Sequence, residues 1–90
     1  MRISIEISYY PLKEEFIPHI FDFLNRLKSY ESIYVESHSM STQVFGEYDD
    51  LMSIITKEIK KSFELPYSVF VLKLMNSDLQ IHPNNTSIDE

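Results

Sequence analysis

Polar and apolar side chains alternate strictly over residues 2–10, the first patterned segment of the chain. One side of the pattern is apolar and consists of Ile3, Ile5, Ile7 and Tyr9. The other side is mostly polar and consists of Arg2, Ser4, Glu6, Ser8 and Tyr10. A period of two with many β-branched residues predicts a half-buried strand, and Pro11 ends it because proline cannot donate to a strand ladder.

Two later segments repeat apolar residues with the period of a helix. The first covers 16–29, and its apolar stripe consists of Ile17, Ile20, Leu24 and Leu27. Pro18 is tolerated there because the first turn of a helix has unpaired N–H groups anyway. The second covers 48–63, starts with two aspartates that suit a helix N-terminus, and ends before Pro66.

Three short segments, 32–38, 41–47 and 67–74, have the character of strands, and the first two form a hairpin around Ser39 and Met40. The resulting order, β-α-β-β-α-β, is that of an α+β ferredoxin-like sandwich. We expect residues 1–75 to form a four-stranded antiparallel sheet in the order 4-1-3-2, with both helices on one face. Residues 76–90 are polar and turn-rich, which predicts a flexible tail.

Composition narrows the classes of function. The 90 residues carry a net charge of −6 and include no cysteine. Nucleic-acid binding depends on neutralising phosphates, so an acidic domain is unsuited to it. No apolar stretch approaches the roughly 20 residues that a bilayer span needs, and the alternating N-terminus is unlike a signal peptide. We therefore expect a cytoplasmic protein that contacts neither nucleic acid nor membrane.

The sequence shows no catalytic or metal-binding constellation. His19, His38 and His82 are scattered over a helix, a strand end and the tail, without a metal-ligand spacing. Only His38, beside the hairpin, can reach the uncovered face of the sheet. No serine lies in a G-x-S-x-G elbow, and no glycine loop is present to cradle a phosphate. The sequence therefore predicts that the protein is not an enzyme and requires no cofactor.

One face of the predicted sheet is left open by the helices, and its side chains are candidates for function. The open face receives the polar side of 2–10. Alternation places Val44 in the core, which puts Ser41, Gln43 and Phe45 on the open face. Thr42, near the beginning of its strand, can point either way.

Glu6 stands out on this face, because it is a carboxylate in the middle of a central strand and acidic residues form strands poorly. In one interpretation Glu6 simply faces water, as on many uncovered sheets. In the other it lines a polar pocket with Ser8 and Gln43, while Tyr10 and Phe45 offer aromatic faces to a ligand. Both interpretations are open at this point.

Two separate phrases of the sequence stand out. The first is Ser-Tyr-Tyr-Pro-Leu at 8–12, at the end of a strand. The second is Ser-Met-Ser-Thr-Gln-Val-Phe-Gly-Glu-Tyr-Asp at 39–49, leading into a helix. Together with the element order, these phrases resemble the YkoF-like family of thiamine-binding proteins, and the resemblance covers about residues 2–75. It implies a ferredoxin-like fold, dimers or tetramers formed through sheet faces, and binding of thiamine or its hydroxymethylpyrimidine part.

We therefore expect a carrier or sensor that binds thiamine or hydroxymethylpyrimidine at the open sheet face or a subunit interface. The alternative is a ligand-free ferredoxin-like module whose open sheet only mediates assembly. The residues expected to bind the ligand are Glu6, Ser8, Tyr10, His38, Ser41, Thr42 and Gln43. A cationic or amine-bearing ligand would be the economical partner of Glu6, since Arg2 is two pleats away and Lys73 has an uncertain register.

Overall fold

The computed structural model describes residues 1–39 and 41–80. Its elements are β1 (Arg2–Pro11), α1 (Ile17–Lys28), β2 (Tyr34–Ser37), β3 (Thr42–Glu47), α2 (Tyr48–Ser62) and β4 (Ser68–Met75). All the predicted elements occur in the predicted order. The largest difference is at β2, which is shorter at its N-terminal end than the predicted segment.

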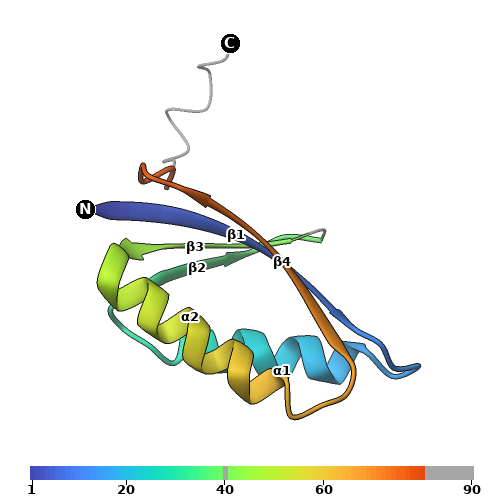
Figure 1. Cartoon of the computed structure of the whole chain (residues 1–90). Helices are drawn as coiled ribbons and strands as arrows, with labels where there is room; N and C mark the ends of the chain where they lie inside the picture. The colour runs from blue at the N-terminus through green and yellow to red at the C-terminus, as the bar shows by residue number, and fades with distance from the viewer. Residues whose placement is uncertain (40, 81–90) are drawn as a thin grey trace.

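The strands form one four-stranded antiparallel sheet in the order β2-β3-β1-β4. Both helices cover the same face of this sheet (Figure 1), so the predicted ferredoxin-like architecture is confirmed. β1 is central and pairs with β3 on one side and with β4 on the other. β2 and β4 form the two edges.

The hydrophobic core lies between the sheet and the helices, as the alternation predicts. Its centre consists of Ile5 and Ile7 from β1, Val44 from β3, Phe23 and Leu27 from α1, and Leu51 and Ile55 from α2. Each of these side chains is at most 2% exposed, and burying one such side chain contributes roughly 1.5–3 kcal/mol. Tyr9 and Phe70 stack at 4.2 Å between ring centroids and extend the core toward β4.

Gly46 sits where β3 passes into α2, inside the second phrase of the resemblance. Its backbone does not adopt a positive φ, so conformational freedom does not explain the glycine. A Cβ at this position would lie 3.2 Å from Cγ2 of Ile33, which is itself buried in the core. The glycine therefore allows the strand end to approach the β2 side of the core closely.

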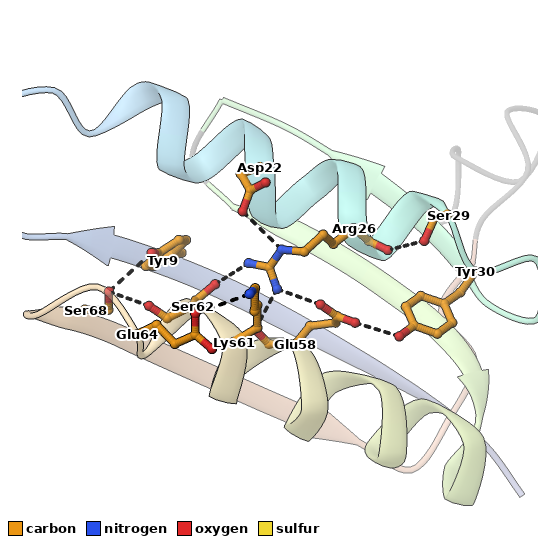
Figure 2. A network of polar contacts seen from close by, with 10 residues as sticks. All are labelled: Tyr9, Asp22, Arg26, Ser29, Tyr30, Glu58, Lys61, Ser62, Glu64 and Ser68. Carbon is orange, nitrogen blue, oxygen red and sulfur yellow. Dashed lines mark hydrogen bonds and ion pairs between the residues drawn. The ribbon is translucent and has the colours of Figure 1, made fainter.

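An ion pair between Arg26 of α1 and Glu58 of α2 joins the two helices (Figure 2). Nη1 of Arg26 donates to Oε1 of Glu58 at 2.6 Å, and Nη2 donates to the Ser62 hydroxyl at 2.6 Å. The Tyr30 hydroxyl donates to the second oxygen of Glu58 at 2.6 Å. The Glu58 side chain is only 8% exposed, and these contacts satisfy its charge.

Titration of this cluster follows from its geometry. Burial raises the pKa of Glu58, but the hydrogen bonds from Tyr30 and Arg26 outweigh it and leave the pKa below its ordinary value. The same hydrogen bond to Glu58 raises the pKa of Tyr30. Glu58 is therefore ionised at neutral pH and joins α2 to α1 as a charged group.

After β4 the chain turns back beside the start of β1 (Figure 1). Of the tail predicted for 76–90, residues 77–79 make hydrogen bonds to Arg2 and Ser4 of β1, and 81–90 lie outside the described residues. In the part of the chain that the structure describes, no helix is long and apolar enough to cross a bilayer.

Candidate functional site

A row of polar side chains crosses the middle of the open sheet face. The register places them side by side on neighbouring strands, and we call Glu36, Gln43, Glu6 and Lys73 the polar row. Oε2 of Glu6 accepts a hydrogen bond from the Ser41 hydroxyl at 2.9 Å. Its other oxygen, Oε1, lies 3.6 Å from Nζ of Lys73. Glu6 is therefore the centre of the row and has contacts on both sides.

Lys73 lies beside Glu6 in the polar row. The protein itself supplies a cationic partner, so a ligand is not needed to balance the carboxylate. The lysine side chain is 79% exposed and that of Glu6 37%, so water screens the pair. Such exposed pairs contribute only about 0–1 kcal/mol. A ligand cation can therefore take the place of the Lys73 ammonium at little cost.

A hollow of about 410 Å³ opens on this face beside the polar row, and we call it the open-face hollow. Its volume is within the range of roughly 300–1,000 Å³ that is usual for small-molecule sites. Its polar end is formed by Glu6, Gln43 and Lys73, and its apolar end by Phe45, Met75 and Leu79. A molecule with one charged or hydrogen-bonding part and one flat apolar part matches this division.

Phe45 lies on the open face, as its position in β3 predicts, yet it is only 1% exposed. It pairs in register with Ser4 on β1 and with Tyr34 on β2. The Tyr34 ring lies 6.1 Å from it between centroids. Ser4 is also buried, at 7% exposed, although it belongs to the polar side of β1. The open face is thus covered by the chain itself near this pair.

A second, smaller hollow of about 100 Å³ lies at the hairpin end of the sheet, next to α1, and we call it the helix-side hollow. Among its lining residues are the predicted site residues Ser8, His38, Ser41 and Thr42. Thr42 is paired with the core residue Ile7 and is 8% exposed. Thr42 therefore faces the helices, which is one of the two orientations that the sequence left open.

The structure divides the predicted site residues into three groups. Glu6, Gln43 and Ser41 come together at the centre of the open face. Ser8, His38 and Thr42 line the helix-side hollow, which Ser41 also borders. Tyr10 is 52% exposed and lines neither hollow.

His38 is also a surface group, with Nε2 3.6 Å from a carboxylate oxygen of Glu36 and a side chain that is 58% exposed. Within the described residues, no three histidine, aspartate or glutamate side chains gather closely enough to hold a metal ion.

Several residues in or beside the site could not be assigned to it from the sequence. Lys73 and Glu36 become neighbours of the site through strand register, which alternation within one strand cannot give. Ser4 is on the predicted face, but nothing marks it as a contact for the C-terminal segment. Leu79 is an apolar residue in a polar stretch, and this isolation is the one sign in the sequence that Leu79 packs against the sheet.

The fold is shared with several solved structures. The chain is similar to protein SP2199 from Streptococcus pneumoniae, with a TM-score of 0.79 and 21% identity over 88% of this chain and 90% of that one. It is similar to a Thermotoga maritima protein provisionally assigned to thiamine biosynthesis or salvage. The TM-score is 0.77 and the identity 16%, over 86% of this chain and 85% of that one. It is also similar to a domain of unknown function, DUF77, from Bacillus cereus. The TM-score is 0.71 and the identity 12%, over 97% of this chain and 88% of that one.

No family model and no curated protein matches the chain. At identities of 21% or less, the structural likeness establishes the α+β ferredoxin-like fold of this chain.

Proposed function

We propose that the chain binds thiamine or its hydroxymethylpyrimidine moiety on the open face of the sheet, as a carrier or sensor and not as an enzyme. The observation that carries the proposal is that Glu6 and Gln43 line the open-face hollow of about 410 Å³, while the Ser41 hydroxyl donates a hydrogen bond to Glu6 from beside it. An aminopyrimidine needs a few hydrogen-bond donors and acceptors, which the hydroxyl and amide supply. A thiazolium cation suits the carboxylate.

The charges of the polar row favour a cationic ligand. Glu6 and Glu36 flank Gln43, and Lys73 is the one basic side chain in the row. A thiazolium over Glu6 would meet the Glu6 carboxylate while Lys73 moves into water, and Glu36, two strands away, would add a second negative charge to its surroundings. The shared fold with the Thermotoga maritima protein provisionally assigned to thiamine biosynthesis or salvage supports the ligand class.

Titration calorimetry of Glu6→Gln with thiamine and with free hydroxymethylpyrimidine tests the proposal. The substitution keeps the shape and removes the charge, so thiamine binding should weaken by about 1.5–3 kcal/mol, as expected for a hydrogen bond to a charged group. Hydroxymethylpyrimidine is neutral and should lose less. Ser41→Ala and Gln43→Ala should weaken both ligands about equally.

Thr42→Val is the matched control, because it is nearly isosteric and faces the helices. It should leave thiamine affinity unchanged. If Thr42→Val abolishes binding while Glu6→Gln does not, the ligand occupies the helix-side hollow and the proposed site is wrong. If the wild-type chain binds neither compound, the proposed function itself is wrong and the open face serves assembly alone.

We further propose that copies of the chain associate through this face as dimers or tetramers. Several apolar side chains on it are 43–52% exposed, namely Tyr10, Val69, Val71 and Met75. Their position around the polar row would let a second sheet cover the open-face hollow. Packing of sheet on sheet would bury these residues and exclude water from the ligand.

A further inference from the structure

We propose that residues 77–80 form a strap that closes the apolar end of the open-face hollow and supplies Leu79 as a wall for a ligand ring. This inference rests on the proposed function and deepens it, because it names the part of the chain that recognises the ring. Leu79 of the strap and Met75 of β4 line the apolar end of the hollow and are 45% and 50% exposed. A flat ligand ring would lie against these two side chains, beside Gln43 of the same hollow, and its attached cation would lie at Glu6.

A single hydroxyl of β1 latches the strap. The Ser4 Oγ donates to the carbonyl oxygen of Ser77 at 2.7 Å and accepts the Leu79 N–H at 2.8 Å. Both backbone groups of the strap are therefore satisfied by one side chain on the sheet. This double contact explains why Ser4, on the nominally open face, is buried, and it sets the height of Leu79 above the sheet.

An ion pair fixes the strap beside this latch. Nε of Arg2 lies 2.6 Å from Oδ2 of Asp78, and the other oxygen of Asp78 accepts the Gln80 N–H at 2.9 Å. The hydrogen bond from Arg2 holds the pKa of Asp78 below its ordinary value, so the pair is charged at neutral pH. Arg2 and Ser4 lie two residues apart on the same face of β1, and they bind consecutive parts of the strap.

The strap is held by polar contacts and not by the core. Leu79 is 45% exposed, and it docks at the margin of the sheet without entering the core cluster between sheet and helices. Segments with few buried apolar contacts open at a lower free energy than the body of a domain. The strap can therefore release and rebind while the sheet stays folded, which gives the ligand a way in and out.

The experiment combines a binding readout with one that needs no ligand. Leu79→Ala removes the wall and should weaken thiamine binding about tenfold, the scale of one or two methylene contacts in a pocket. Leu79→Met keeps an apolar side chain and should restore most of the affinity. Leu12→Ala changes another exposed leucine, 58% against 45% for Leu79, just beyond the far end of β1, and should have no effect.

Ser4→Ala tests the latch by hydrogen–deuterium exchange of the Leu79 amide in the free protein. Loss of its acceptor should speed exchange about tenfold, while amides of α2 keep the wild-type rate. Unchanged exchange in Ser4→Ala overturns the latch. Wild-type affinity in Leu79→Ala, with thiamine bound normally by the wild-type chain, overturns the strap and leaves the proposed function standing. Absence of any binding by the wild-type chain overturns both.

Discussion

The two faces of the sheet are built from the same strands, yet they differ in what holds their side chains in place. On the helix-covered face, Ile3, Ile5 and Ile7 of β1 are each at most 2% exposed and pack against both helices. On the other face, Glu6 and Ser8 of the same strand are only half buried and lie among hydroxyl, amide and charged groups. The helix-covered face carries the stability of the domain, and the open face is free to carry recognition.

Phe23 and Phe45 give the strongest test of this division, because each is 1% exposed but they lie on opposite sides of the sheet. Phe23→Ala leaves a cavity between α1 and the sheet and should lower the free energy of unfolding by about 4 kcal/mol. Phe45→Ala opens a space that the strap and Tyr34 can partly fill, so we expect a loss of about 2 kcal/mol. Urea denaturation measures both. Equal losses would show that the open face contributes to the core as much as the covered one.

The ion pair between the helices gives the next largest effect. Arg26→Met leaves Glu58 buried without its cation, which should reduce the free energy of unfolding by about 3 kcal/mol. Thiamine affinity should not change, because the pair lies on the far side of the sheet from the polar row. The double variant Arg26→Met/Glu58→Met should recover much of the stability, since an apolar pair removes the buried charge. Failure of the double variant to recover would mean that the pair itself stabilises the domain.

Acid titration sharpens the same test. The folded-state pKa of Glu58 is lowered from 4.5, so its contribution is present above pH 4.5 and is lost as the pH falls through the folded value. In Arg26→Met the hydrogen bond and the charge of Arg26 no longer lower this pKa, so Glu58 takes up its proton at a higher pH than in the wild type. The difference in free energy of unfolding between wild type and variant should therefore narrow from pH 7 to pH 4. A constant difference would contradict the assignment of Glu58 as the charged partner.

Self-association should change when residues of the open face are substituted and should not change when residues of the helices are. Val71→Lys places a charge among the exposed apolar side chains opposite Ser8. We expect it to change the free energy of unfolding of the monomer by less than about 0.5 kcal/mol but to shift sedimentation toward 10.7 kDa. Phe21→Lys, on the exposed surface of α1, is the control and should leave assembly intact. A wild-type chain that sediments as a monomer at micromolar concentration would refute association.

Removal of 81–90 should produce the smallest effect. This segment has few apolar residues, and we expect the thermal midpoint to change by about 1 °C or less. Removal of 77–90 takes the strap as well and should lower the midpoint further, because Ser4 and Phe45 become exposed. A fall of several degrees in the shorter deletion would show that Ile81, which lies outside the described residues, contributes to docking.

The sequence was sufficient to predict the fold and the assignment of faces, because both depend on periodicity within single elements. Alternation in β1 correctly assigned the isoleucines to the core and Glu6 to the open face. It did not reveal Lys73 as the neighbour of Glu6, since this depends on how a distant strand aligns with β1. Glu58 was also hidden: a glutamate on an amphipathic helix usually faces water, and its partner Arg26 lies on the other helix. Thr42 was ambiguous because alternation is least reliable near the ends of a strand.

The edge position of β4 bears on how the protein behaves at high concentration. An unpaired strand edge that is long and apolar is a template for further strands, and a lysine on such an edge acts as a gatekeeper against aggregation. Along the eight residues of β4, from Ser68 to Met75, Lys73 is the charged residue. We therefore expect the lysine that faces Glu6 also to hinder aggregation through this edge. Variants that remove it should form fibrillar or amorphous aggregates sooner, and their affinities are best measured in dilute solution.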